Sequence, residues 1–348
     1  MKILVVGLGG IGQRHLRNLL TVLGDRARVR AVAPRSDIPV LTDKLTVEPG
    51  LTLQEKYGLH IYPDLDSGLG WGPDAVFVCT PTSLHTATAL RAAQANAHLF
   101  IEKPLAHSLE GVDQLLEEIE RRGLTAVVGY QMRFHPGLQR LHALLQEQRV
   151  GRVLSVHAEI GEYLPGWHTY EDYRQMYASR RDLGGGVILS QIHEMDYLYW
   201  LFGLPRRVYA LGGHLSHLEV DVEDTADILF EFERDGNPLP VSLHEDYLQR
   251  PPSRGCKVIG DHGKILLDFP SASLTVFDGE GQQIEHTHFE NFQRNDMFLD
   301  EIRHFVQALE GRPHSLVPIR DGLQSLRMAL AAKQSLESRK IVSLDEVR

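Results

Sequence analysis

The sequence predicts an α/β protein of two domains: a doubly wound parallel sheet, followed by an α+β domain with a large, mostly antiparallel open sheet. A glycine-rich turn lies between an apolar strand-like run and a helix-like stretch at the start of the chain. Strand and helix patterns then alternate up to about residue 123, as a parallel sheet requires. Beyond that point strand patterns follow one another, as in antiparallel sheets.

The first domain is expected to span residues 1–123 and the second, for substrate binding and oligomerisation, residues 124–348, with its C-terminal helices packing back on the first domain or against the sheet edge. Residues 29–32, 74–79 and 98–101 are predicted strands of the first sheet, and 83–96 has the Ala and Leu spacing of a helix. Because the carboxyl ends of parallel strands meet at one edge, ligands are expected to bind where these strands end.

The turn at residues 7–12, GLGGIG, is typical of a dinucleotide site. Gly7 permits the tight turn, Gly9 lets the backbone approach a pyrophosphate, and Gly12 allows close packing of helix on strand. A pyrophosphate is favoured at the helix N-terminus by free N–H groups and the dipole. Gly10 and Ile11 belong to the same turn and are expected cofactor contacts. Thr80-Pro81 and Glu102-Lys103-Pro104 end two other strands and converge on the same crevice.

The second strand indicates the choice of nicotinamide cofactor. An acidic residue about 20 positions after the glycines normally bonds the ribose 2′-hydroxyl of NAD. Here the strand leads into Ala33-Pro34-Arg35-Ser36, and Arg35 with Ser36 suits a 2′-phosphate. The sequence therefore favours NADP over NAD. Asp37 keeps NAD open, since a small shift of register brings it to the ribose.

Lys103 follows an apolar strand and precedes a proline, which holds its backbone extended or in a turn. Two interpretations stay open. Its ammonium polarises a hydroxyl or carbonyl beside a nicotinamide, or it is a surface charge paired with Glu102.

Composition limits the class of partner. The chain has 348 residues and a formal net charge of -10, which argues against nucleic acid and anionic membranes. The first strand begins at Lys2 and no apolar run reaches the length of a membrane span, so a cytoplasmic location is expected. Two distant cysteines predict no disulfide framework. The 18 histidines show no recognisable ligand spacing, so no metal is expected.

Several motifs together resemble the glucose-fructose oxidoreductase and inositol dehydrogenase family, written Gfo/Idh/MocA. They are the glycine turn, the segments TPTSLH at 80–85 and EKP at 102–104, GYQMRFHP at 129–136, and GGG at 184–186 leading to HEMD at 193–196. The resemblance covers essentially the whole chain. It implies a Rossmann domain plus an open-sheet domain, a catalytic pair Lys103 and His193, and sugars, inositols or their derivatives as substrates. It also adds His85 to the expected cofactor contacts Thr80, Pro81, Glu102 and Lys103, and Arg133 to the substrate contacts.

One position departs from the family pattern. The family usually carries an aspartate one turn before its histidine, whereas this chain has no carboxylate there and Ser190 takes the place. A serine hydroxyl bonds a substrate hydroxyl but cannot stabilise a charged histidine. It stays open whether His193 or Lys103 is the main acid or base. Asp196 shares the helix face of His193 and is a further expected substrate contact.

In the second domain, strands are predicted at 153–160, 207–215, 226–232, 241–247, 257–259 and 264–269, and helices at 292–310 and 319–338. The exposed face of such a sheet favours a homodimer or homotetramer. The loop after the first of these strands is aromatic. Tyr163 and Trp167 are expected to stack on a sugar or base and His168 to reach a hydroxyl, or the loop simply packs under the sheet.

The sequence predicts an NAD(P)-dependent dehydrogenase that moves a hydride between nicotinamide and a secondary alcohol or ketone of a sugar derivative, with an amino-sugar nucleotide as one candidate substrate. Two alternatives stay open. One is a glycosidase that uses the nicotinamide transiently. The other is a non-catalytic nucleotide sensor, which would not need Lys103 or His193.

Overall fold

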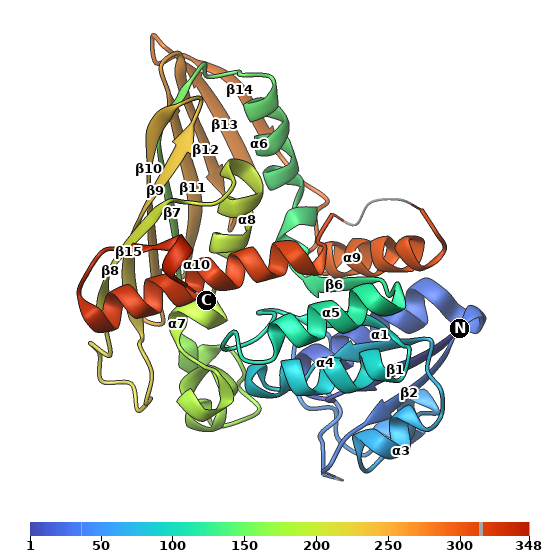
Figure 1. The fold of residues 1–348 in the computed structure, drawn as a ribbon. Coiled ribbons are helices and arrows are strands. Elements are labelled where there is room, and N and C mark those ends of the chain that lie inside the picture. Colours follow the sequence, from blue (N-terminus) through green and yellow to red (C-terminus); the bar gives the residue numbers. More distant parts are fainter. Residues whose placement is uncertain (36, 313–315, 348) are drawn as a thin grey trace.

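The computed structural model describes residues 1–35, 37–312 and 316–347. Two sheets form its frame and lie one above the other in Figure 1. The lower one is six-stranded and parallel in the order β3-β2-β1-β4-β5-β6, which is the Rossmann arrangement that the sequence predicts. Its strands are β1 (Lys2–Val6), β2 (Arg28–Val32), β3 (His60–Tyr62), β4 (Ala75–Val78), β5 (His98–Glu102) and β6 (Ala126–Gly129).

Helices connect these parallel strands and cover the sheet. They are α1 (Gly10–Leu23), α2 (Leu53–Tyr57), α3 (Leu65–Leu69), α4 (His85–Gln94) and α5 (Val112–Arg122). Every residue of β4 and of β6 is buried, as is typical of a parallel sheet covered on both faces. β6 lies beyond residue 123, where the sequence patterns suggested the first domain would end. By sheet membership, the first unit therefore extends to Gly129.

The upper sheet has nine strands in the order β14-β13-β12-β11-β7-β10-β9-β8-β15. All neighbours are antiparallel except β7 and β10, so the predicted open, mostly antiparallel sheet is confirmed. The strands are β7 (Val153–Gly161), β8 (Arg207–Gly213), β9 (Thr225–Arg234), β10 (Asn237–Asp246), β11 (Ser253–Gly260), β12 (Gly263–Asp268), β13 (Ser273–Asp278), β14 (Gln283–His288) and β15 (Val342–Ser343).

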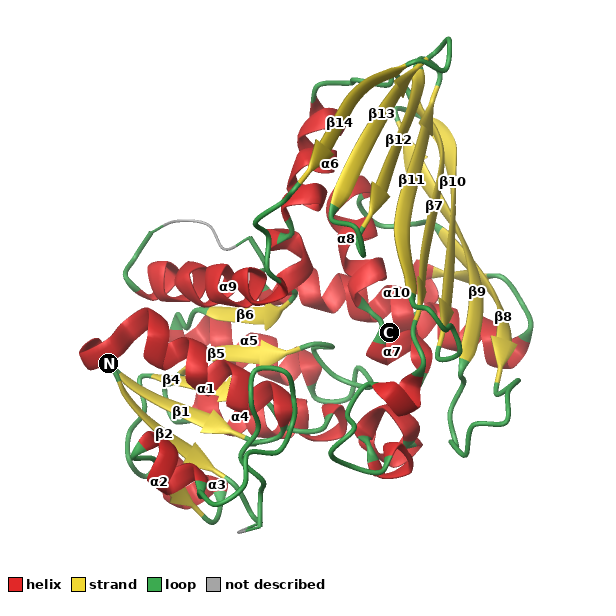
Figure 2. Ribbon diagram, turned by 180° about the vertical axis from the view of Figure 1, so that it is seen from behind, coloured by secondary structure: helices red, strands yellow, loops and turns green. Residues whose placement is uncertain are grey.

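Helices α6 (Pro136–Gln146), α7 (Val187–Ser190) and α8 (His193–Phe202) lie on one face of this sheet, while the other face carries no helix of the described chain (Figure 2). α10 (Ile319–Ser338) packs along β8 and α8 and also reaches β6, so it spans the junction of the two sheets. Strand β9 alternates buried and more exposed residues, as expected for a sheet with one covered face.

Helix α9 (Arg294–Leu309) joins the core of the first domain through aromatic rings. Phe77 of β4 and Phe100 of β5 stack with centroids 4.5 Å apart, and Phe305 of α9 meets both edge-on at 5.5 and 5.7 Å. Such edge-to-face contacts add to the burial of apolar area. The C-terminal part of the chain therefore packs back on the N-terminal sheet.

Glu301 of α9 is 1% exposed, and neither of its carboxylate oxygens has a partner among the described residues. Burial, followed by the neighbouring charges of Glu102 and Asp196, raises the pKa of Glu301 well above its usual value. Glu301 is therefore a neutral acid in the folded chain at pH values where the unfolded chain has lost the proton.

We expect replacement of Glu301 by Gln to flatten the pH dependence of stability. Since the folded state holds a proton that the unfolded state releases above about pH 4.3, the wild-type free energy of unfolding falls as pH rises, by up to about 1.4 kcal/mol per pH unit from this group. Urea unfolding of the wild type and of Glu301→Gln between pH 5 and 8 measures how the free energy of unfolding of each protein changes with pH. Glu310→Gln, at the exposed end of the same helix, is the control. Equal slopes for wild type and Glu301→Gln would show that Glu301 is ionised in the fold.

Candidate active site

The glycine turn between β1 and α1 has the shape that a dinucleotide needs. Gly7 has φ 97°, and a Cβ there would lie 2.5 Å from the Cys79 carbonyl oxygen. A Cβ on Gly12 would lie 2.0 Å from the Gly7 oxygen, so neither position accepts a side chain. A Cβ on Gly9 would meet nothing within 4 Å, which leaves open room beside the backbone.

The N-terminus of α1 is ready for an anion. No side chain caps it, and its first turn contains no acidic residue. The Gly10 N–H meets the Tyr170 hydroxyl oxygen, while the following N–H groups and the positive end of the helix dipole are available to a pyrophosphate. Ile11, in this first turn, is half-buried and packs on the core of the first domain. The turn as a whole fits the dinucleotide that the sequence predicts.

His85 holds together the two loops that follow β4 and β5. It is buried, with Nδ1 2.8 Å from the Pro104 oxygen and Nε2 2.9 Å from the Thr80 oxygen. Burial lowers the pKa of His85 more than these carbonyl groups raise it, so the ring is neutral at pH 7 and donates its single N–H to one of the two oxygens while it lies against the other. His85 thus positions the loop that carries Thr80 and Pro81, both half-buried, against the loop that carries Lys103.

Glu102 faces the interior of the first domain. Its Oε1 lies 2.5 Å from Nε2 of His15, and its Oε2 accepts the backbone N–H of Lys103 at 3.2 Å. The ammonium of Lys103 points elsewhere and donates to the carbonyl oxygen of Ser190 at 2.7 Å. The structure therefore does not support the interpretation of Lys103 as a surface charge paired with Glu102.

Lys103 and His193 come together at the end of α7 and the start of α8. Ser190, whose carbonyl receives the ammonium, is the last residue of α7, and His193 is the first residue of α8. Burial lowers the pKa of His193 well below its usual value, and the charge of Lys103 lowers it further. Gln131 Nε2 lies 3.1 Å from His193 Nε2. The ring is neutral, and it carries its proton on Nδ1 when Gln131 donates to Nε2.

Several buried polar atoms around this pair have no partner among the described residues: Thr80 Oγ1, Gln131 Oε1, Gln191 Oε1 and His193 Nδ1. Buried polar groups are normally hydrogen-bonded, and an unpaired one is expensive. These are neutral donors and acceptors of the kind that bind hydroxyl and amide groups. The site is therefore suited to a small ligand rich in such groups.

An ion pair that the sequence did not single out lies beside His193. Glu194 is completely buried and receives two hydrogen bonds from Arg254 of β11, at 2.7 and 3.1 Å. Arg254 also lowers the pKa of His193. No sequence motif marks Arg254, because its partner is distant in the chain. Gln131 was detectable only as a member of the segment at 129–136.

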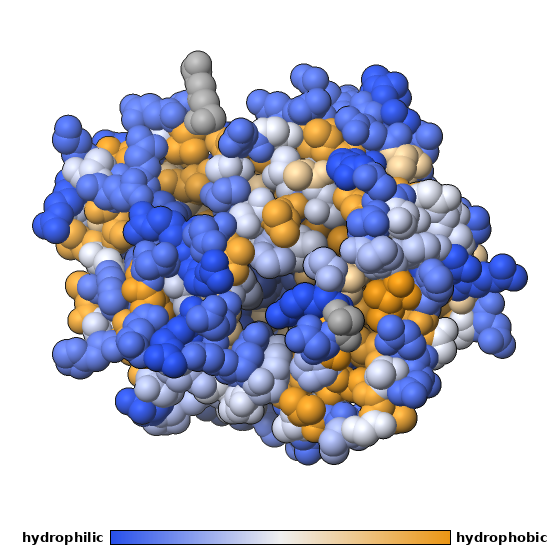
Figure 3. Space-filling model, turned by 90° about the horizontal axis from the view of Figure 1, so that it is seen from below, coloured by the Kyte–Doolittle hydropathy of each residue, from blue (hydrophilic) through white to orange (hydrophobic). Residues whose placement is uncertain are grey.

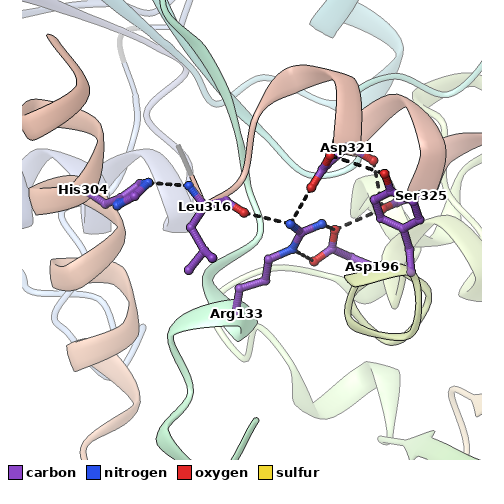
Figure 4. A network of polar contacts seen from close by, with 7 residues as sticks. Arg133, Asp196, His304, Leu316, Asp321 and Ser325 are labelled. Carbon is purple, nitrogen blue, oxygen red and sulfur yellow. Dashed lines mark hydrogen bonds and ion pairs between the residues drawn. The ribbon is translucent and has the colours of Figure 1, made fainter. Parts of the chain in front are cut away.

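Arg133 and Asp196 do not reach the site as the sequence predicts. They form a buried ion pair, 0% exposed on both sides, with two hydrogen bonds of 2.7 and 2.9 Å (Figure 4). Arg133 also donates to Asp321 and to the Leu316 carbonyl, each at 2.7 Å, and Ser325 donates to Asp196. All their polar atoms point into the protein, so their place in the structure is architectural.

The aromatic loop after β7 is half-buried. The Tyr163 ring lies under the guanidinium of Arg250, 3.9 Å from its centroid. Trp167 meets Tyr247 edge-on at 5.4 Å, and its buried indole N–H has no partner among the described residues. His168 contacts Glu171 at 2.9 Å. Of the three residues of this loop that were predicted to bind substrate, Trp167 has a buried donor without a partner among the described residues.

Arg35 is exposed after β2, as a 2′-phosphate contact requires, and Asp37 is exposed as well. Ser36 lies outside the described residues. Figure 3 shows the underside of the molecule, hollowed near its middle and mostly hydrophilic around the hollow. Over the described ranges, no three His, Cys, Asp or Glu side chains gather in a way that could hold a metal ion. No helix in those ranges is long and apolar enough to cross a membrane.

The Rossmann sheet and its glycine turn are those of a dinucleotide-binding protein. Two family models match the chain: the GFO/IDH/MocA oxidoreductase family with its NAD-binding Rossmann fold over residues 1–130, and the GFO/IDH/MocA C-terminal domain over 138–266. The chain belongs to the GFO/IDH/MocA family. It is an NAD(P)-dependent dehydrogenase acting on CH–OH groups.

Among its relatives is myo-inositol 2-dehydrogenase of Thermotoga maritima, 27% identical over 359 residues that cover 100% of this chain and 99% of that protein. The WlbA dehydrogenase of Bordetella pertussis, solved with NADH and UDP-GlcNAcA, has a TM-score of 0.80 at 21% identity and covers 99% of this chain and 98% of its own. UDP-N-acetylglucosamine 3-dehydrogenase GnnA of Acidithiobacillus ferrooxidans has a TM-score of 0.76 at 22% identity, over 97% and 98% of the two chains. Both structures share the fold.

We expect Arg133→Met to destabilise the fold by about 3–5 kcal/mol, because it leaves the buried charge of Asp196 unpaired. Urea unfolding measures the loss, and addition of Asp196→Leu should recover part of it. The KM of folded variant protein should stay near the wild-type value. A variant with wild-type stability and a raised KM would instead show that Arg133 contacts the substrate, as the sequence predicts.

Proposed function

We propose that this chain transfers a hydride between a nicotinamide and a secondary alcohol or ketone of a sugar or sugar derivative, with an amino-sugar nucleotide as the favoured substrate. The observation that carries the proposal is the meeting of Lys103 and His193 among buried neutral donors and acceptors that lack partners. Such groups discriminate strongly in favour of a ligand that satisfies them. The inositol and UDP-sugar names of the relatives support the same class.

The two catalytic candidates have different parts in this proposal. The neutral ring of His193, with its proton on Nδ1, orients a substrate oxygen by donating to it. Lys103 carries the proton: its ammonium donates to the oxygen during ketone reduction, and its neutral amine accepts the proton during alcohol oxidation. The Ser190 carbonyl keeps Nζ in place. The nicotinamide, when bound, supplies or accepts the hydride.

The glycine turn would hold the pyrophosphate, and the loops at Thr80-Pro81 and Lys103 would line the nicotinamide end. We propose NADP as the preferred cofactor, with NAD as the alternative. Exposed Arg35 at the end of β2 supports NADP, since a guanidinium suits a 2′-phosphate. Asp37, also exposed, supports the alternative.

Tyr163 and Trp167 would provide the aromatic wall of the substrate site, with His168 at its rim. The unpaired indole N–H of Trp167 supports a polar ligand beside this loop. Aromatic faces with one polar edge suit sugar rings and nucleobases.

We also propose a cytoplasmic homodimer or homotetramer. The helix-free face of the nine-stranded sheet exposes Leu211 of β8 and Leu229 of β9 at 51% and 57%. Such side chains on neighbouring strands favour association through this face. Two buried free cysteines suit a reducing compartment.

The test of the function is nicotinamide absorbance with purified enzyme, NAD or NADP, and a panel of sugars, inositols and amino-sugar nucleotides. We expect a stoichiometric rise with an amino-sugar nucleotide, faster with NADP. Product formation without a net change in nicotinamide absorbance would favour the glycosidase. Binding of the nicotinamide without product from any compound of the panel would favour the sensor.

Replacement of Lys103 by Met should lower kcat by roughly a hundred- to ten-thousand-fold, the usual contribution of a positioned acid or base, and leave the Kd for reduced nicotinamide near wild type. His193→Asn should act mainly on KM, since it orients the substrate. Lys340→Met, an exposed lysine near the C-terminus, is the matched control. A larger loss of kcat for His193→Asn than for Lys103→Met would reverse the two roles.

A further inference from the structure

We infer that Tyr170, from the second domain, completes the cofactor site by placing its hydroxyl over the N-terminus of α1, where it donates a hydrogen bond to the dinucleotide pyrophosphate. The inference rests on the proposed cofactor site and is independent of the sugar substrate. It makes the aromatic loop a shared part of the cofactor and substrate sites.

The geometry comes from the space above the glycine turn. A Cβ on Gly10 would lie 3.1 Å from the Tyr170 hydroxyl oxygen and 3.2 Å from Leu45 Cδ2. The Cβ position of Gly9, one residue earlier, is open. Two segments from different domains therefore cover Gly10, while room for a phosphate remains beside Gly9. A phosphate placed there would lie next to the Tyr170 hydroxyl.

The chemistry of Tyr170 suits this place. Burial, the charge of Glu171 and a hydrogen bond to the Glu171 carboxylate raise the pKa of Tyr170, although the Gly10 backbone N–H, which donates to the phenol oxygen, acts in the opposite direction. The phenol therefore keeps its proton at neutral pH. It gives this proton to Glu171 in the structure and, in this inference, exchanges that carboxylate for an oxygen of the bound pyrophosphate. No side chain of α1 caps its N-terminus, and the Tyr170 oxygen accepts the Gly10 N–H. The hydroxyl therefore lies beside the backbone N–H groups that would bind a phosphate.

Neighbouring contacts hold the Tyr170 ring. It stacks on His168 with centroids 5.3 Å apart and an interplanar angle of 20°. His168 in turn contacts Glu171 at 2.9 Å. Tyr163 and Trp167 lie earlier in the same loop. Binding of the dinucleotide through Tyr170 therefore fixes the loop that supplies the aromatic wall, which favours binding of cofactor before substrate.

The experiment is fluorescence titration of wild type, Tyr170→Phe and Tyr173→Phe with NADH and NADPH, without substrate. The hydroxyl of Tyr173 accepts the Glu219 backbone N–H at 3.1 Å, so this variant removes a loop hydroxyl that is committed elsewhere. We expect Tyr170→Phe to bind the preferred nucleotide about ten-fold more weakly, as loss of one hydrogen bond to a charged group produces. The Kd of Tyr173→Phe should stay within about twofold of wild type.

An unchanged Kd for Tyr170→Phe would overturn the inference. An equal loss of affinity in both variants would also overturn it, because that result would mean general disruption of the loop. Thermal unfolding of each variant shows whether a loss of stability accompanies the weaker binding. Failure of wild type to bind either nucleotide would overturn the cofactor site itself, whereas tight binding without turnover would count against the proposed function alone.

A second readout tests the link to the aromatic loop. Trp167 is one of three tryptophans, and replacement of Trp71 and Trp200 by Phe makes it the sole reporter. Its emission should change on nucleotide binding, and the change at saturation should shrink when Tyr170→Phe is added. No change in Trp167 emission would overturn the coupling.

Discussion

The segment that leaves the first sheet is anchored in the second domain by the buried pair of Arg133 and Asp196. Arg133 follows the last strand of the first sheet, Asp196 is on α8, and Asp321 of α10 completes the charge balance. Gln131, two residues before Arg133, contacts His193, which is three residues before Asp196. The segment that carries Arg133 therefore also carries, through Gln131, a direct contact to the ring of His193. A site of this kind needs its supporting contacts as much as its reacting groups.

Burial also decides the charge state of the groups near the site. His193 is neutral because it is out of water and faces Lys103, Arg254 and other cations. Glu194 lies equally deep, and its carboxylate is matched by Arg254. A desolvated environment strengthens each electrostatic interaction, so the ammonium of Lys103, held by the Ser190 carbonyl, acts strongly on the groups around it. Lys103 is the one of these cations that is proposed to exchange a proton.

The sequence predicted what local chemistry determines. The glycine turn, the parallel strands and the helix at 319–338 follow from backbone geometry and from the spacing of apolar residues, and the structure has them. The partners of charged residues follow from tertiary packing and could not be predicted from the sequence. Arg133 and Asp196 look like ligand contacts in sequence, because only the fold brings Asp321 and Ser325 to them. Strands β13 and β14 were missed, since their short runs mix polar and apolar residues.

The end of the chain closes the edge of the first sheet. β6 is the outermost strand of that sheet, and Val128 N–H donates to the Val317 oxygen at 3.2 Å, while Val127 and Pro318 form an antiparallel bridge. During synthesis, β6 therefore keeps a bare edge until residues 317–318 have left the ribosome. Unpaired edges of this kind attract other chains. The order of elements along the chain thus leaves this edge open to other chains throughout the synthesis of the nine-stranded sheet up to β14.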